Sequence, residues 1–175
     1  MKPARRLGFT LIELLTVITI IAILVALLFP AVKAAIIKAE TARARTMVQH
    51  IGAAFRSYYV EYSIWPTSSA GTVTFDLTTN LFRNTASITF LDVSAKDIYP
   101  TNILYAKGTI LDPWQHPYRC RVDGDFANNG TLANPFSGGA TINAGYAIWS
   151  DGPDGTNDTG AAQDAGLNKD NIRSW

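Results

Sequence analysis

The first thirty residues constrain the fold more than any other part of the chain. A short basic head leads into an apolar run from Phe9 to Phe29, which carries one charge, Glu13. About 20 apolar residues are enough for a helix to cross a bilayer. A carboxylate in such a helix costs roughly 2.5–3.5 kcal/mol at the bilayer centre, and less near the end of the run, where Glu13 lies. We therefore expect Glu13 to have a partner.

A cleaved secretory signal peptide does not account for this segment. Such a signal has an apolar stretch of about 7–15 residues, followed by a cleavage site of small residues. Here the apolar run is longer, no A-x-A site follows it, and the small residue Gly8 lies before it. On composition alone, the segment is an uncleaved single-span anchor.

A local motif supports a second interpretation. The sequence GFTLIE at residues 8–13 resembles, at every position, the processing site of type IV pilin-like precursors. In that family, prepilin peptidase cuts after the glycine and methylates the new terminal amine. The resemblance thus implies a leader at 1–8, cleavage between Gly8 and Phe9, and N-methylation of Phe9. Pro30 matches a helix proline that is common in the family.

The position of Glu13 fits this resemblance. Cleavage would leave an ammonium or methylammonium group at Phe9, about one helical turn before Glu13. The carboxylate could pair with this amine or with that of a neighbouring subunit in a filament core. Such pairing would offset the burial of both charges and fix the axial register. The alternative is that Glu13 snorkels to the lipid headgroups.

The apolar run is expected to continue into one long helix. An alanine-rich stretch with scattered charges favours helix beyond Pro30, although a proline predicts a kink or local unwinding there. Apolar residues then recur at steps of three and four, as on one helix face. Pro66 ends the pattern, so the helix should run from about Thr10 to about Tyr62. The apolar face consists of Val48, Ile51, Phe55, Tyr58 and Tyr62.

The rest of the chain predicts a small sheet. Weak β-leaning pieces occur at 72–77 and 87–93, and clearer strands at 118–122 and 146–150. Glycine and asparagine clusters between the clearer strands predict turns. We expect a hairpin over about 117–150, with a further strand, packed on the helix.

A helix followed by strands predicts the α+β class. The resemblance implies a type IV pilin-like fold, in which a long amino-terminal helix, membrane-spanning in its first half, packs on a small antiparallel β-sheet. The expected segments are a cleaved leader (1–8), a transmembrane and filament-core helix (9–30), an amphipathic helix (31–62), a variable region (63–108), and the sheet with a carboxyl-terminal loop (109–175).

Two further segments resemble the major pseudopilin of type II secretion systems. The sequence LDPWQHPY at 111–118 is close to the family pattern D-P-W-G-x-P-Y, with Gln115 and His116 in place of a glycine and a polar residue. We expect a rigid, partly buried turn there. The sequence YAIWSDGPDG at 146–155, with DNI at 170–172 and Trp175, is similar to the family's calcium loop and its closing element.

The resemblance implies a calcium site in this carboxyl-terminal tail. Calcium takes about 6–8 oxygen ligands. Asp154 matches the loop carboxylate and Asp170 the closing one, whereas Asp151 would supply only its backbone carbonyl. Asn171 replaces an expected aspartate, which lowers the charge of the site.

Two observations leave this site open. Asp158 or Asp164 could supply the missing carboxylate, because the loop is longer than in the family. However, Asp-Gly and Asn-Asp pairs are also ordinary turn formers. The spacing of a standard EF-hand is absent.

The composition argues against several other functions. A formal net charge of +1 gives no sign of nucleic-acid binding. The single cysteine, Cys120, cannot form an internal disulfide and is expected to be a small buried hydrophobe. His50 and His116 belong to no metal-ligand set or catalytic triad, and no phosphate-binding loop occurs. We therefore expect that the chain is not an enzyme.

The resemblance implies a structural subunit, the major pseudopilin, cut by prepilin peptidase. It would be held in the bacterial inner membrane by a single span, with its carboxyl-terminal domain in the periplasm. It would then assemble, with minor pseudopilins and an inner-membrane assembly platform, into a homo-oligomeric helical filament that drives protein export. Basic residues flank both ends of the apolar run, so charge alone gives little indication of orientation.

Two other functions remain open from the sequence. A type IV pilus subunit for adhesion, motility or DNA uptake has the same amino end, but such pilins often close a carboxyl-terminal loop with a disulfide. A membrane-tethered ligand-binding module, for example for carbohydrate, would use exposed aromatic residues such as Trp65, Trp114 and Trp149.

Overall fold

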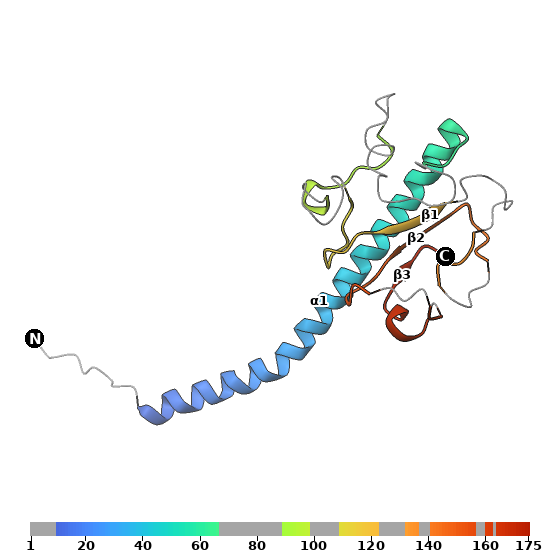
Figure 1. Cartoon of the computed structure of the whole chain (residues 1–175). Helices are drawn as coiled ribbons and strands as arrows, with labels where there is room; N and C mark the ends of the chain where they lie inside the picture. Colours follow the sequence, from blue (N-terminus) through green and yellow to red (C-terminus); the bar gives the residue numbers. More distant parts are fainter. Residues whose placement is uncertain are drawn as a thin grey trace, which may run out of the picture. The chain divides into compact units, whose positions relative to one another are not determined.

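The computed structural model shows one long helix and a small sheet (Figure 1). It describes residues 10–66, 89–98, 109–122, 132–136, 141–156, 160–162 and 164–175. The elements are helix α1 (Leu11–Tyr62), the short 3-10 helices η1 (Ala95–Asp97) and η2 (Gly166–Asn168), and strands β1 (Arg119–Val122), β2 (Tyr146–Ser150) and β3 (Ile172–Arg173). The chain divides into two compact units, Met1–Ala39 and Glu40–Trp175, and α1 contributes residues to both.

In the first unit, α1 exposes apolar side chains all round. The large apolar residues at 11–37 are at least half exposed or nearly so, from 46% at Val32 to 87% at Leu11. A helix without a polar face needs lipid or other helices around it, and this one is long and apolar enough to cross a membrane. It remains helical at Pro30, so the local unwinding expected there does not occur, and a kink stays a prediction.

In the second unit, one face of α1 forms the core. The predicted residues Val48, Ile51 and Phe55 are buried, which confirms the expected apolar face. Tyr58 and Tyr62 lie half-buried at the end of this face. The helix ends at Tyr62, as predicted.

The sheet is antiparallel, in the order β1-β2-β3. Arg119 pairs with Trp149, and Trp149 with Arg173 on its other side. Because successive strand residues point to opposite faces, Cys120 and Ile148 enter the main core with α1, whereas Ala147 joins a second apolar cluster. The hairpin, the further strand, the burial of Cys120 and the α+β class are confirmed.

The weak β tendency of segment 87–93 does not lead to a strand, as far as the segment is described. Residues 89–93 form no strand. Leu91 is buried in the main core, and the backbone next pairs only at Ile98, in a single bridge with Ile110. Burial of the Leu91 side chain fixes this segment to the core, but without backbone pairing to a neighbouring strand the segment is not a strand. The pieces at 72–77 and the predicted turns at 124, 128–130 and 137–139 lie outside the described residues.

The expectation of three exposed tryptophans was also partly wrong. Trp149 is only 6% exposed, because Phe136 and Trp175 pack on it. Trp114 is half-buried, and its indole Nε1 donates to Glu40 Oε2 at 3.0 Å. Trp65 is half-buried too, and it lines a pocket.

Candidate functional site

Helix α1 begins with a reciprocal pair of polar residues. The Thr10 amide and Oγ1 donate to Glu13 Oε2 at 2.8 and 2.7 Å, and the Glu13 amide donates to Thr10 Oγ1 at 3.3 Å. This is a capping box, which satisfies amides that the first helical turn leaves without partners. Sequence analysis singled out Glu13 but missed Thr10, although the T-x-x-E spacing was the available signal.

This capping box holds a carboxylate on the exposed, apolar part of α1. Its neighbours Leu11 and Ile12 are 87% and 69% exposed. A negative charge at a helix amino terminus is also favoured by the helix dipole. Gly8 and Phe9 lie outside the described residues, so the predicted pairing of Glu13 with the Phe9 amine stays a prediction.

A second polar centre lies where the turn at 111–118 meets the sheet. Asp112 is 2% exposed. Its Oδ1 accepts from the amides of Trp114 and His116 at 3.0 and 2.8 Å, and its Oδ2 accepts from Ser150 Oγ at 2.7 Å. Burial raises the pKa of the Asp112 carboxyl, and these hydrogen bonds partly oppose the rise. The expected partly buried turn is thus confirmed, with Asp112 at its centre, and its rigidity stays a prediction.

Asp151 has a side-chain role that the sequence analysis did not assign. Its carboxylate is almost fully buried, and Oδ2 accepts from Arg119 Nε at 2.8 Å. Burial raises the pKa of Asp151, while Arg119 lowers it. The signal was the strand register, because Arg119 lies opposite Trp149 and a diagonal neighbour two residues on shares its face.

The loop after β2 is held from two sides. Gly152 has φ +75°, and a Cβ there would lie 2.7 Å from the Asp170 carbonyl oxygen and 2.9 Å from Asp170 Oδ2. Gly155 has φ +63°, and a Cβ there would lie 2.4 Å from His116 Nε2. His116 Nδ1 also lies 3.2 Å from the Gly152 carbonyl oxygen. The loop and its predicted closing residue, Asp170, therefore do come together.

The described carboxylates do not by themselves complete a metal centre. No group of three or more His, Cys, Asp or Glu side chains within the described ranges is placed to hold a metal ion. Asp154 Oδ1 accepts from the Thr156 amide, as in an ordinary turn, and Asp164 pairs with Arg173. Asp158 lies outside the described residues.

Two buried side-chain oxygens of this region lack a hydrogen-bond partner among the described residues. Asp151 Oδ1 and Asn171 Oδ1 are buried and have no hydrogen-bond partner in the described structure. Buried polar atoms without partners are rare in native proteins, and binding of a cation is one explanation for them. Asp170 also lies beside Gly152 of this loop, and calcium binding stays a prediction.

The comparisons bear on the amino end. Residues 3–29 match the family model of the prokaryotic N-terminal methylation motif. The match covers the capping box and the apolar part of α1, and it indicates a prepilin-type, type IV pilin-like protein. Such a motif implies processing by prepilin peptidase and pilus-like assembly. The long helix and small antiparallel sheet are consistent with the type IV pilin-like fold. A comparison with curated proteins gives no match.

Proposed function

We propose that the chain is a structural, non-enzymatic subunit, the major pseudopilin of a type II secretion system. Prepilin peptidase removes residues 1–8 and methylates the amine of Phe9. The subunit is stored in the bacterial inner membrane with its carboxyl-terminal domain in the periplasm. An inner-membrane platform then assembles it, with minor pseudopilins, into a periplasmic filament whose growth drives protein export.

The observation that carries this proposal is the single carboxylate at the start of an exposed apolar helix. Packing of α1 against copies of itself is favourable, because it removes apolar side chains from water and replaces lipid contacts with close helix–helix contacts. Glu13 would enter the same dry core, where an unpaired charge is costly. The freed amine of a neighbouring Phe9 would neutralise it and set the axial position of each new subunit.

The carboxyl-terminal half supports the secretion filament over a type IV pilus. The turn at 111–118 is organised by a buried carboxylate, Asp112, and the loop after β2 is closed by β3 and the Arg119–Asp151 pair. This closure requires no disulfide, and Cys120 is a buried free thiol. Calcium held by Asp154, Asp170 and Asn171, with the Asp151 carbonyl, would add a cross-link between the loop and its closing segment.

Deletion and complementation in the native host test the proposal. Loss of the gene should leave exoproteins in the periplasm, and the wild-type gene should restore export. Glu13→Gln should not restore it, whereas Glu61→Gln should, because Glu61 is an exposed residue of α1 in the second unit. Intact mass should show loss of Met1–Gly8 and gain of one methyl group.

The same strains distinguish a secretion pseudopilin from a type IV pilus subunit. If export is normal in the deletion strain while twitching or DNA uptake is lost, the chain is a type IV pilus subunit. If the native protein keeps residues 1–8 and stays monomeric, both filament functions are wrong and the membrane-tethered binding module is favoured.

A further inference from the structure

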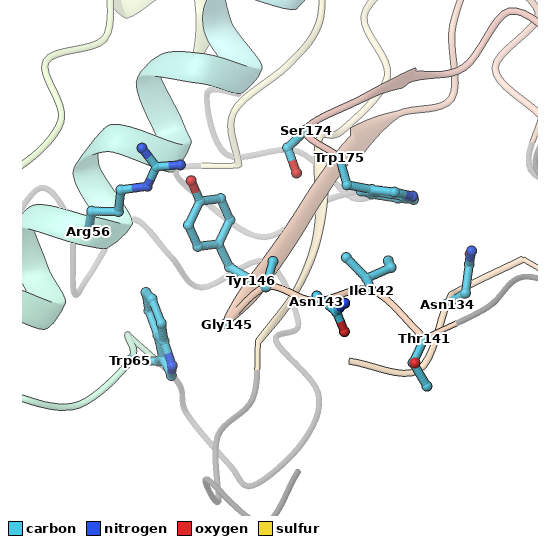
Figure 2. Close-up of a pocket in the computed structure, with 11 residues that line it drawn as sticks. Arg56, Trp65, Asn134, Thr141, Ile142, Asn143, Gly145, Tyr146, Ser174 and Trp175 are labelled. Carbon is cyan, nitrogen blue, oxygen red and sulfur yellow. The ribbon is translucent and has the colours of Figure 1, made fainter. Parts of the chain in front are cut away.

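A groove in the second unit is not explained by filament formation. It starts from a pocket of about 730 Å³, lined by residues of α1, of the segment before β2 and of the carboxyl-terminal segment (Figure 2). A second pocket of about 360 Å³ shares Arg56, Tyr146, Ser174 and Trp175 with the first. We call the two together the arginine–aromatic groove. Small-molecule sites have comparable volumes, about 300–1,000 Å³.

The aromatic walls of the groove are fixed in place. Trp65 stacks on Tyr59, with ring centroids 4.5 Å apart, and meets Tyr146 edge-on at 5.7 Å. The Trp65 ring packs directly on the backbone of Gly145, where a Cβ would lie 2.2 Å from a ring carbon. Trp175 is held edge-on by Trp149 at 6.2 Å. Rings that are already ordered lose little entropy when a ligand stacks on them.

The groove is also cationic. Arg45, Arg56 and Arg173 line it. Arg173 pairs with Asp164, but no ion pair is found for Arg45 or Arg56 in the described part of the chain. The Arg56 guanidinium carbon lies 5.5 Å from the centre of the Tyr146 ring, and Figure 2 shows it turned toward the Tyr146 hydroxyl. This contact orients Arg56, and no described carboxylate pairs with its charge.

Small polar side chains line the first pocket between the aromatic residues. Thr141 and Asn143 are exposed there, and Asn134 lies close by. Amides and hydroxyls both donate and accept hydrogen bonds, so they suit a ligand rich in hydroxyl groups. A purely apolar ligand would bury them unsatisfied, at a cost.

We propose that the arginine–aromatic groove binds a saccharide that carries carboxylates. The carbon-bound hydrogens of a sugar ring stack on aromatic faces, its hydroxyls bond to Thr141 and Asn143, and its carboxylate takes the planar guanidinium of Arg56 in a bidentate pair. A neutral sugar would leave the arginines unmatched. A nucleic acid is less suited, because the chain has a formal net charge of only +1. The inference is independent of filament assembly.

Titration of the full chain in a neutral detergent tests this site, with a galacturonic acid tetrasaccharide as probe and a galactose tetrasaccharide as neutral counterpart. Calorimetry and tryptophan fluorescence should both report binding of the acidic probe, with affinity at least about tenfold above that of the neutral one. Arg56→Gln should weaken acidic-probe binding by about tenfold or more, since it removes one charge-assisted pair.

Two further variants keep the test specific. Gly145→Ala should weaken binding of both probes, because its methyl group displaces Trp65. Lys169→Gln should change neither affinity, because Lys169 is exposed and does not line the groove. Absence of binding, equal losses in Arg56→Gln and Lys169→Gln, or stronger binding of a single-stranded oligonucleotide than of the acidic sugar would each overturn the proposal.

Discussion

Thr10 and Glu13 cap the amino end of α1 with reciprocal hydrogen bonds, in which the backbone amide of each residue donates to the side chain of the other. The Thr10 hydroxyl also donates directly to the Glu13 carboxylate. The carboxylate at the start of the apolar part of α1, inside the segment that matches the methylation motif, is therefore oriented by a residue of its own chain.

Loss of the Thr10 hydroxyl should impair assembly without removing the charge. Thr10→Val keeps the shape of the side chain but loses the cap, which costs about 1 kcal/mol and frees the carboxylate to rotate. We expect a lower yield of sheared filaments, and Thr10→Ser should restore it. Intact mass should be measured alongside, because the prediction requires normal cleavage after Gly8. A wild-type yield from Thr10→Val would contradict it.

The Arg119–Asp151 pair should stabilise the second unit. Arg119→Met leaves the buried Asp151 carboxylate without its partner, and we expect a loss of about 2 kcal/mol in the free energy of unfolding. Since Arg119 is itself 41% exposed, the larger losses typical of fully buried pairs do not apply. Urea unfolding of the full chain in detergent measures the change. Arg121→Met, on the same strand, should cost less than about 1 kcal/mol.

Asp112 should make stability depend on pH. Burial raises the pKa of its carboxyl above the ordinary value of 3.8. The folded protein then binds this proton more tightly than the unfolded chain does. The contribution of Asp112 to the free energy of unfolding is therefore complete below the pKa of the unfolded chain, and it is lost as the pH rises through the pKa of the folded protein. The stability of Asp112→Asn should therefore improve relative to wild type as pH rises from about 4 to 7.

The comparison is made by urea unfolding at a series of pH values, with chelator present. Asp92→Asn is the control, because Asp92 is exposed. A constant difference between Asp112→Asn and wild type across this pH range would show that the Asp112 carboxyl has the same pKa in both states.

Gly155 and Gly166 provide a matched pair for the contact with His116. Both have positive φ, +63° and +57°, so alanine costs about 1–2 kcal/mol of backbone strain at either site. Only Gly155 is close to a side chain, the His116 ring, whereas a Cβ on Gly166 meets nothing within 4 Å. Gly155→Ala should thus be more destabilising than Gly166→Ala, as measured by thermal unfolding.

The additional destabilisation by Gly155→Ala, relative to Gly166→Ala, should depend on His116. In the double variant Gly155→Ala, His116→Ala, the loss should fall short of the sum of the single losses by about 1 kcal/mol or more, because the clash is gone. Additive losses would mean that the imidazole does not pack on this loop.

The long helix could be predicted because its signals are local. Apolar steps of three and four lead to Phe55 and Tyr62, and Pro66 ends them. Strands β1 and β2 were likewise visible in their own residues. Strand β3 has only two residues, Ile172 and Arg173, too few to show alternation, so a further strand was expected without a position.

What the sequence could not predict depends on distant neighbours. Trp149 was expected to be exposed, because one face of an antiparallel sheet is often solvated. The rings of Phe136 and Trp175 instead pack on Trp149 and bury it. The Arg119–Asp151 pair requires the strand register, and the groove beside Trp65 requires the packing of separate segments.

Calcium should stabilise the carboxyl-terminal loop if the predicted ligands hold it. A ligand that binds only the folded state raises stability by RT ln(1 + [L]/Kd), about 2.7 kcal/mol at a concentration 100 times Kd. The Tm of the full chain in detergent should therefore rise with about millimolar calcium and fall with chelator. Asp154→Asn and Asp170→Asn should reduce the rise, whereas Asp92→Asn should not. If calcium and chelator both leave the Tm unchanged, the loop is closed by β3, His116 and the Arg119–Asp151 pair alone, and the two unpartnered oxygens of Asp151 and Asn171 need another explanation.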